Sequence, residues 1–571
     1  MNRAARPPLP RVIAATVGVA FVLVFGASRA PRTAHAQTVI YVNDTDDPTT
    51  SDGDCEKPSD RCTLRGAVAR ASQLNGGLVI RACFDATLVP GADACPTGVR
   101  ALNARARGFD PATGKWTIRL TKDRVILLAQ GGTFVDFRIG FPWAGPQDNR
   151  IIIESGGPAQ ESAFRLGSQR NVLAGFELRG SFKEAAIHVP GGVLGEPARL
   201  NQLGPGLIFA GMPEGAGIKL TSELATANTI IGNWCGITGD GTVVDPVFED
   251  CVQIDQGAFG NIIGDLDPSN RNVFAASVNG GGVIVEGPDA ADNAVQGNWF
   301  GMLATGKDTP TTKLKTGIQL ILGPQRTKVQ RNVISGNATA GIYLSDAAMD
   351  TEIDDNLIGT DPTGQRCVAN RGYGIHLQGG PRLTKIRRNT IRCNTSGGIL
   401  MAGASTRDNI ASQNSISANN ASNAISVIQG ANGGIQAPRI TTAMRTQVSG
   451  TSCALCTIEV FSDPDGEAET YEGNVIADGD GNWVFDKPEG VKGPFVTATA
   501  TDGDNTSSTS AFKTLSGDPP TASPTASPDE PSATPATPSP APTTPTVQPT
   551  TPAVTGAPIY LPWTASAYAF K

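Results

Sequence analysis

The sequence is poor in histidine, in aromatic residues and in long apolar runs. Aromatic residues make up 6% of 571 residues, and there are only three histidines. Zinc sites need thiol and imidazole ligands at finger spacing, whereas His188 and His376, the histidines beyond residue 36, each stand alone. Beyond Phe25 no stretch approaches the roughly 20 apolar residues of a spanning helix. These shortages argue against a zinc protein and against a transmembrane segment in the mature chain.

Basic charge is also scarce, apart from the N-terminus. The formal net charge is −7, and residues 1–36 contain five arginines and no acid, so the remainder carries −7 minus 5, or −12. An acidic chain without a basic stripe is a poor nucleic-acid partner. Residues 1–36 combine arginines, an apolar run and Ala34-His35-Ala36, which predicts a secretory signal peptide cleaved before Gln37. We therefore expect a secreted or cell-surface protein.

Ten cysteines fall into five near-neighbour pairs along the chain. This pattern predicts local disulfides formed in an oxidising compartment, although spacing alone does not fix the connectivity. The candidate pairs are Cys55 and Cys62, Cys83 and Cys95, Cys235 and Cys251, Cys367 and Cys393, and Cys453 and Cys456.

A degenerate repeat dominates the middle of the chain. Asn-x-Ile/Val is followed about ten residues later by Gly-Ile-x-Leu, in apolar runs too short for helices. Asn332-Val333-Ile334 with Gly341-Ile342-Tyr343-Leu344 is one copy, and the Asn332 to Asn356 step is 24 residues. We take Asn228, Asn261 and Asn293 as earlier copies of the same asparagine. The repeat predicts coils of short parallel strands.

In such coils the alternating apolar residues point inward and stack about 4.8 Å apart. Asparagine at one corner of each coil is expected to adopt a left-handed turn and to pass amide hydrogen bonds along the stack. Glycine opens the following strand, where a β-carbon would be crowded. No amphipathic helix separates the strands, which excludes a βαβ fold, and the tight hairpins of a β-propeller are absent.

Residues about 150 to 437 resemble the pectate-lyase-like right-handed β-helix repeats of secreted bacterial proteins. The loop from Asn356 to Gly364 matches their N-x-I-G-T-D-x-T-G insertion. Residues 62–68 resemble the C-S-L-R-E-A-I motif at the start of such proteins, with Gly66 in place of the motif's Glu. The resemblance implies an all-β right-handed parallel β-helix (solenoid) at 150–437 behind an N-terminal cap with first coils at 37–149. Thr63 is expected to N-cap a helix ending near Gln73.

The repeat ends at Pro438, and the sequence beyond it has a different pattern. Alternating strands at 457–461, 482–485 and 495–500 predict a small β-sandwich over 438–515, which resembles bacterial Ig-like modules. Residues 516–557 are rich in Pro, Thr and Ser and predict a disordered linker. The tail at 558–571 contains Leu561-Pro562-Trp563-Thr564, which lacks the glycine, apolar span and basic end of a sortase signal.

Aligning the coils on Asn332, Asn356 and Asn389 places charges of alternating sign above one another. The three columns are Lys328, Glu352 and Lys385; Gln330, Asp354 and Arg387; and Arg331, Asp355 and Arg388. One interpretation is a ladder of ion pairs on an exposed sheet. The other is a groove for a charged glycan, in which Glu352, Asp354, Asp355, Lys385 and Arg387 are the catalytic candidates.

Other candidate residues have plain structural interpretations. Glu249-Asp250-Cys251-Val252-Gln253-Ile254 resembles a pectin-hydrolase strand, but its companion segments are absent and Cys251 occupies a repeat slot. His376 falls at an outward strand position, which favours a solvated side chain. Calcium is the candidate cofactor, and its candidate ligands are Asp361, Asp463, Asp465, Asp478 and Asp480. These residues lie in predicted turns, and the geometry of a turn alone accounts for aspartate at such positions.

The architecture favours a monomeric, non-enzymatic secreted or surface protein that binds extracellular polysaccharide or cell-envelope components, or that serves adhesion. The alternative is a polysaccharide lyase or glycoside hydrolase acting on acidic polysaccharide. A third reading, end-to-end assembly of β-helices, conflicts with the expected cap and sandwich.

Overall fold

The computed structural model describes residues 39–47, 55–57, 61–75, 77–85, 87–89, 95–120, 125–138, 145–157, 160–192, 196–420 and 424–517. The chain divides into two compact units, Met1–Pro519 and Pro520–Lys571, and every described residue belongs to the first. The predicted signal peptide, the C-terminal tail and nearly all of the predicted linker lie outside the described residues. Among the described residues, no helix is long and apolar enough to cross a membrane.

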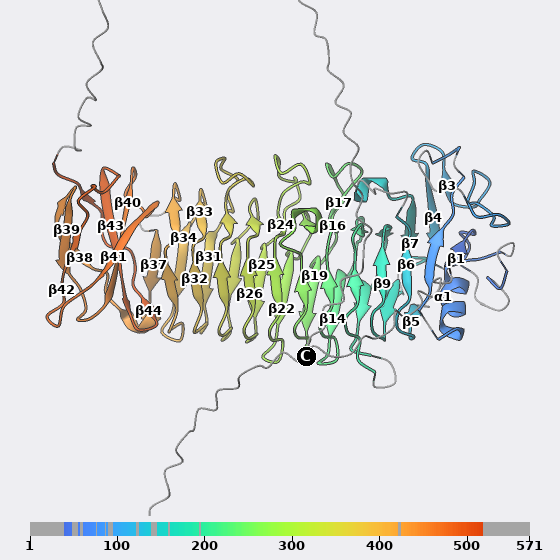
Figure 1. The fold of residues 1–571 in the computed structure, drawn as a ribbon, viewed down its shortest axis with the longest axis horizontal. Helices are drawn as coiled ribbons and strands as arrows, with labels where there is room; N and C mark the ends of the chain where they lie inside the picture. The colour runs from blue at the N-terminus through green and yellow to red at the C-terminus, as the bar shows by residue number, and fades with distance from the viewer. Residues whose placement is uncertain are drawn as a thin grey trace, which may run out of the picture. The chain divides into compact units, whose positions relative to one another are not determined.

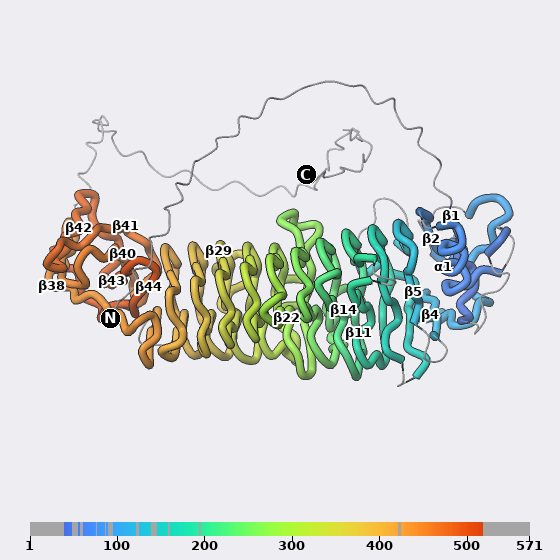
Figure 2. Tube along the Cα trace, turned by 90° about the horizontal axis from the view of Figure 1, so that it is seen from below, coloured from blue at the N-terminus to red at the C-terminus, as the bar shows by residue number. Residues whose placement is uncertain are grey.

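Three long sheets run through residues 39–428, and their coils lie side by side along the stack (Figures 1 and 2). The strands within each sheet pair in parallel, except that β3 and β4 are antiparallel. The first sheet contains β1 (Val39–Val42), β2 (Val79–Ala82), β6 (Phe134–Asp136), β9 (Val172–Ala174), β12 (Gln202–Leu203), β15 (Thr229–Ile230), β20 (Ile262–Ile263), β23 (Ala294–Gln296), β26 (Lys328–Gln330), β29 (Glu352–Asp354), β32 (Lys385–Arg387) and β35 (Ile410–Ser412).

The second and third sheets follow the first around each coil. The second sheet contains β3 (Phe109–Asp110), β4 (Lys115–Arg119), β7 (Ile151–Glu154), β10 (Glu177–Arg179), β13 (Ile208–Phe209), β16 (Trp234–Cys235), β21 (Val273–Phe274), β24 (Trp299–Phe300), β27 (Val333–Ile334), β30 (Leu357–Ile358), β33 (Thr390–Arg392) and β36 (Ser415–Ser417). The third sheet contains β5 (Ile126–Leu128), β8 (Phe164–Leu166), β11 (Ala185–Val189), β14 (Ala216–Thr221), β19 (Val252–Asp255), β22 (Val283–Glu286), β25 (Ile318–Ile321), β28 (Ile342–Leu344), β31 (Tyr373–Gln378), β34 (Gly397–Ala402) and β37 (Ile425–Ile428).

The predicted parallel β-helix is therefore confirmed, and its coils extend back to β1. Inward residues of all three sheets form one continuous core in which Val329, Ile353 and Ile386 are fully buried. The predicted crowding at the opening glycine is also present. A β-carbon on Gly317 would come within 2.5 Å of the Ile334 side chain.

The asparagines form three ladders rather than one, which corrects the prediction. The first ladder precedes the first sheet and includes Asn171, Asn201, Asn228, Asn261 and Asn293. The second precedes the second sheet and includes Asn233, Asn272, Asn298, Asn332, Asn356, Asn389 and Asn414. The third follows the second sheet and includes Asn337, Asn370, Asn394 and Asn419.

Treating Asn228, Asn261 and Asn293 as copies of Asn332 was thus wrong, because the two sets occupy different corners. The left-handed residue was also misplaced. Arg331 (φ 53°), Asp355 (φ 57°) and Arg388 (φ 54°) adopt that conformation, one position before each asparagine. The asparagine side chain can then reach the neighbouring coil.

The N-terminal end carries the single α-helix described, α1 (Leu64–Gln73), which lies against β1 and β5. Thr63 caps it by accepting a hydrogen bond from the Gly66 backbone amide at 3.1 Å. All ten cysteines form disulfides in the predicted neighbouring pairs. Three short 3₁₀ helices span Pro146–Asp148, Pro268–Asn270 and Ala431–Gly434.

Two antiparallel sheets follow the last coil and surround a separate apolar core; we call residues 438–517 the two-sheet module. One sheet contains β38 (Arg439–Met444), β39 (Gln447–Thr451) and β42 (Asn482–Asp486). The other contains β40 (Thr457–Asp463), β41 (Thr470–Ile476), β43 (Phe495–Asp502), β44 (Asn505–Thr506) and β45 (Lys513–Thr514). A short hairpin, β17 (Ile237–Thr238) with β18 (Val243–Val244), projects from a second-sheet turn.

Candidate functional site

The predicted charge ladder lies on the outer face of the first sheet and at the corner beside it. Register places Lys328, Glu352 and Lys385 opposite one another, as predicted, and aligns Gln330, Asp354 and Arg387. Arg387 binds Asp354 through two hydrogen bonds of 3.0 Å and lies 3.7 Å from Glu352. Arg388 binds Asp355 in the same way, at 3.0 and 3.2 Å.

Each carboxylate of this ladder therefore has an arginine partner. Hydrogen bonding to Asp354 raises the pKa of Arg387, and hydrogen bonding to Asp355 raises that of Arg388. Lys385 opposes Glu352 in register. Such exposed pairs contribute about 0–1 kcal/mol each. The arrangement supports the ladder interpretation, and whether these residues have a catalytic role stays a hypothesis.

The calcium candidates accept hydrogen bonds from their own turns. Asp361 accepts from the backbone amides of Thr363, Gln365 and Arg366, and Asp478 accepts from those of Asp480 and Asn482. Asp463 accepts from the amides of Asp465 and Gly466. Within the described ranges, no three His, Cys, Asp or Glu side chains gather as a metal site.

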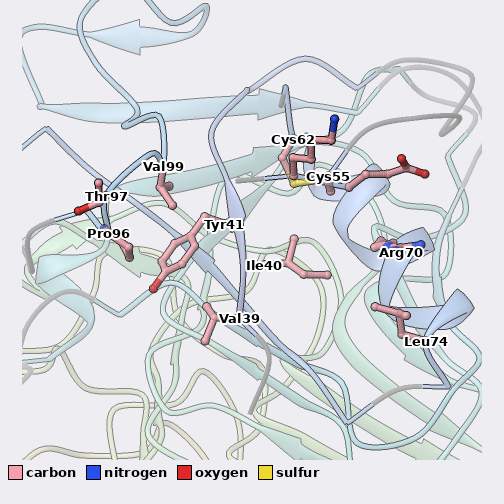
Figure 3. A pocket seen from close by; sticks show the side chains of 12 residues that line it. Val39, Ile40, Tyr41, Cys55, Cys62, Arg70, Leu74, Pro96, Thr97 and Val99 are labelled. Carbon is pink, nitrogen blue, oxygen red and sulfur yellow. A yellow bond between two sulfur atoms is a disulfide. The ribbon is translucent and has the colours of Figure 1, made fainter. Parts of the chain in front are cut away.

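A cavity of about 380 Å³ lies beside β1 at the N-terminal end. Figure 3 shows Tyr41 on one side of it near Pro96 and Val99, with α1 supplying Arg70 and Leu74 on the other. Its lining is largely apolar, and the disulfide between Cys55 and Cys62 forms part of its wall. The cavity belongs to the cap.

A different surface, on the outer face of the third sheet, was not singled out from the sequence. One outward residue from each of nine consecutive strands aligns in register, and we call this column the third-sheet stripe. Its members are Arg165, His188, Lys219, Gln253, Ile284, Gln319, Tyr343, His376 and Leu400.

The N-terminal end of the stripe is charged and contains a cavity of about 400 Å³. Lys219 Nζ lies 3.1 Å from Glu184 and 3.9 Å from Asp255, and His188 Nε2 lies 3.0 Å from the Thr221 hydroxyl. Burial, with Arg165 adding to it, lowers the pKa of His188 to about 4. The imidazole is therefore neutral at pH 7.

Two carboxyl groups, one just before β19 and one at its end, have raised pKa values. Burial raises the pKa of Asp250 to about 6, although the Gly281 amide donates to it at 2.7 Å. Burial also raises the pKa of Asp255. The prediction that Cys251-Val252-Gln253-Ile254 fills the slot of Gly-Ile-x-Leu agrees with the register, because Val252, Gln253 and Ile254 pair with Ile218, Lys219 and Leu220. Cys251 is bonded to Cys235 across the core.

The C-terminal end of the stripe is aromatic and uncharged. The His376 ring lies 5.3 Å from Tyr343 and 5.7 Å from Tyr373, measured between centroids. Gln378 donates a 2.7 Å hydrogen bond to the Tyr343 hydroxyl. Burial lowers the pKa of His376, so this ring is also neutral at pH 7. His376 is half-buried between two tyrosines, which corrects the interpretation of a solvated side chain.

With this geometry in view, comparison with known proteins identifies the fold. A family described as right-handed beta helix region matches residues 316–482, from the turn before β25 to the start of β42. The prediction of a right-handed parallel β-helix is confirmed. No protein of curated function matches the sequence.

Several solved structures are similar to this chain at low sequence identity. The A-module of mannuronan C-5 epimerase AlgE4 from Azotobacter vinelandii is 15% identical, with 64% of this chain and 86% of that chain covered and a TM-score of 0.40. The enzymatically active domain of tailspike protein 2 of bacteriophage CBA120 is 11% identical, with 79% of this chain and 73% of that chain covered and a TM-score of 0.35. PfbA, a surface adhesin of Streptococcus pneumoniae, is 10% identical, covering 74% and 93%, with a TM-score of 0.28.

Proposed function

We propose that this is a secreted or surface-displayed, non-enzymatic protein that binds an extended, uncharged glycan along the third-sheet stripe. The observation that carries the proposal is the register itself. Nine outward positions stand on consecutive strands about 4.8 Å apart, close to the spacing of sugars in a linear polysaccharide. Seven of the nine carry polar or aromatic side chains, and the other two, Ile284 and Leu400, are buried.

The aromatic end is the part best suited to an uncharged sugar. Tyr343, Tyr373 and His376 present half-exposed rings, and Gln319 and Gln378 lie on the same face. Aromatic anchors dominate binding energies in many interfaces because they bury large areas at little entropic cost. Amide side chains can donate to and accept from sugar hydroxyls.

The charged, N-terminal end of the stripe is better suited to binding than to catalysis. A base with a pKa of about 4, as in His188, is a weak proton acceptor at pH 7, whereas efficient general bases titrate near the working pH. Lys219 is already paired with Glu184. The five disulfides suit the oxidising environment of an exported protein.

The test is affinity electrophoresis of the purified chain in gels containing neutral or acidic polysaccharides. We expect retardation by at least one neutral polysaccharide and about tenfold weaker binding by Tyr343→Ala, which corresponds to about 1.4 kcal/mol. Arg387→Gln, on the first sheet, is the matched control and should bind like the parent chain. The proposal would be contradicted if Tyr343→Ala bound the polysaccharide as tightly as the parent chain, or if only Arg387→Gln lost binding.

The same incubations test the alternative of a glycoside hydrolase. Asp250 favours it, because a carboxyl group that titrates near pH 6 can act as a general acid. Shortening of polysaccharide chains by the parent protein, without new unsaturated ends and abolished in Asp250→Asn, would establish hydrolysis and displace the non-enzymatic account.

A further inference from the structure

The first strand of the first sheet, β1, has an open edge. Among the described residues it pairs with one strand, β2, and it stands at the end of the sheet order. Elsewhere in this sheet, residues in the register column of Val39 donate their amides to the preceding strand, as Phe134 does to Leu78 at 2.9 Å. No strand precedes β1 in the sheet, so the Val39 amide turns toward the open edge.

Tyr41 turns its backbone groups to the same side. Alternate residues of a parallel strand share one direction of hydrogen bonding, and Tyr41 follows Val39 by two positions. Asn43, two positions further, donates its amide to the Cys62 carbonyl of the cap at 2.9 Å. Within the described part of the chain, the Val39 and Tyr41 amides have no such backbone partner.

This open edge lies in the cavity of about 380 Å³ at the N-terminal end. Figure 3 shows β1 between two walls, with Leu74 of α1 on one side and Pro96 and Val99 beside Tyr41 on the other. Leu74 is 44% exposed, and Val39 is 36% exposed. Unpaired backbone groups between apolar walls suit an extended peptide, which can add a strand and place alternate side chains against the walls.

The walls also favour a slender occupant. In a second copy of this chain the same strand lies between the same walls, and so two recessed edges cannot approach to the roughly 4.8 Å that separates paired strands. An extended segment of another protein has no such walls. Because β1 spans four residues, the added strand is of similar length.

Arg70 gives the groove a charge preference. It lines the cavity and donates to Gln73 of its own helix at 3.1 Å, and it forms no ion pair with a described carboxylate. Glu56 and Lys57 also line the cavity, and their opposite charges leave the balance to Arg70. The guanidinium fork matches a carboxylate through two hydrogen bonds.

We propose that the groove beside β1 binds an extended peptide segment of another protein, which adds a strand parallel to β1 and places a carboxylate on Arg70. Parallel pairing continues the first sheet, whose other strands pair in this way. Apolar side chains of the peptide lie against Leu74 and Val99. The site is independent of the glycan surface proposed on the third sheet, and it makes the N-terminal end of the β-helix a protein-docking end.

The test uses the purified full chain and a short fluorescein-labelled probe peptide, in which valine and threonine alternate around one aspartate and the C-terminus is amidated. Fluorescence anisotropy measures binding, and hydrogen exchange measures the protection of the Tyr41 amide. We expect saturable binding and about tenfold slower exchange at Tyr41. Methylation of alternate backbone nitrogens of the probe should weaken binding by about tenfold or more, because it removes the strand hydrogen bonds.

Val39→Pro tests the edge itself. Proline is tolerated at an edge position whose amide is unpaired, but it removes that donor and blocks the added strand, so binding should weaken by about tenfold or more. Leu74→Ser should weaken binding by a smaller factor. Leu383→Ser is its matched control, because Leu383 is 40% exposed on the turn before β32, and this variant should bind the probe like the parent chain.

Arg70→Gln tests the charge preference. It should weaken the aspartate probe severalfold and leave a probe with asparagine in place of aspartate unchanged, since only the first carries the carboxylate. A third probe, with asparagine and a free C-terminal carboxylate, distinguishes a side-chain carboxylate from a chain terminus. Tighter binding of this third probe would support the proposal and assign the carboxylate to the end of the partner segment.

Absence of probe binding, an unprotected Tyr41 amide, or parent-like binding by folded Val39→Pro and Leu74→Ser would overturn the proposal. Sedimentation of the chain alone covers the other occupant. Concentration-dependent dimers that Val39→Pro abolishes would assign the edge to a second copy and overturn the peptide site. Tyr343→Ala should bind the probe like the parent chain, so failure of this site is distinguishable from failure of the glycan surface.

Discussion

Three threonines interrupt the first ladder, at residues 327, 351 and 384. Each is buried, and the hydroxyl of each has no hydrogen-bond partner among the described residues. The Thr384 backbone amide donates to Asn409 at 3.1 Å, as an asparagine in that place would do. The ladder therefore lacks side chains that could connect Asn293 to Asn409.

We predict that Thr384→Asn stabilises the protein. The new amide would donate to Asn409 and its oxygen would accept from the Thr351 backbone amide, as in the intact part of the ladder. A net gain of about 1 kcal/mol in the free energy of unfolding is expected from denaturant titration. Thr384→Val is the control and should be nearly neutral because it removes an unpaired hydroxyl. A loss of stability in Thr384→Asn would show that the corner has no room for the longer side chain.

At the scale of elements, the disulfide between Cys235 and Cys251 replaces a packing motif found in the other coils. Cys235 aligns with Phe209 and Phe274 on the second sheet, and Cys251 stands where Gly217 and Gly282 open third-sheet strands. In those coils a glycine makes room for a large apolar side chain. The disulfide fills the same space with two small residues and a covalent bond.

Cys235→Ile with Cys251→Gly should therefore restore the repeat while removing the cross-link. The bond closes a segment with a separation of 16 residues, so its loss should cost about 3 kcal/mol. Cys235→Ala with Cys251→Ala should cost a further 1–3 kcal/mol or so, because it also leaves a cavity. Thermal and denaturant unfolding of the two double variants gives the comparison. Equal stability would show that repeat packing contributes little at this coil.

The repeat period and the inward apolar positions are local properties, and so the coils and the alternation of charge around Asp354 could be predicted from sequence. The third-sheet stripe could not, because Tyr343 and His376 are 33 residues apart in the chain and meet only through parallel pairing across an insertion of unknown length. Asn228 and Asn332 were assigned to one corner of the coil because asparagines occupy both corners and make the same hydrogen bonds there.

At the scale of the whole molecule, the two-sheet module covers the last coil. A parallel stack ends in strands with unpaired amides, which favour association unless they are covered. Glu467 of the module accepts two hydrogen bonds from Asn419, at 2.8 and 3.1 Å, and so continues the third ladder. Glu459 accepts from the Gln413 amide at 3.0 Å, and Ile416 pairs with Ala468.

This cap should make stability depend on pH through Glu467. Burial raises its pKa to about 7 from a value of 4.5 in the unfolded chain. Between those values the folded state holds a proton that the unfolded state releases. The free energy of unfolding should therefore fall as pH rises from about 4.5 to 7, by up to about 3 kcal/mol.

Glu467→Gln should remove that part of the pH dependence while keeping the side-chain shape. Denaturant unfolding of both proteins at pH 5 and pH 8 isolates the effect, because Asp250 and His188 titrate equally in each. We expect the parent chain to lose more stability than Glu467→Gln between the two pH values. An identical loss would mean that Glu467 is ionised in the folded protein, and that the carboxylate covers the end of the stack as an anion.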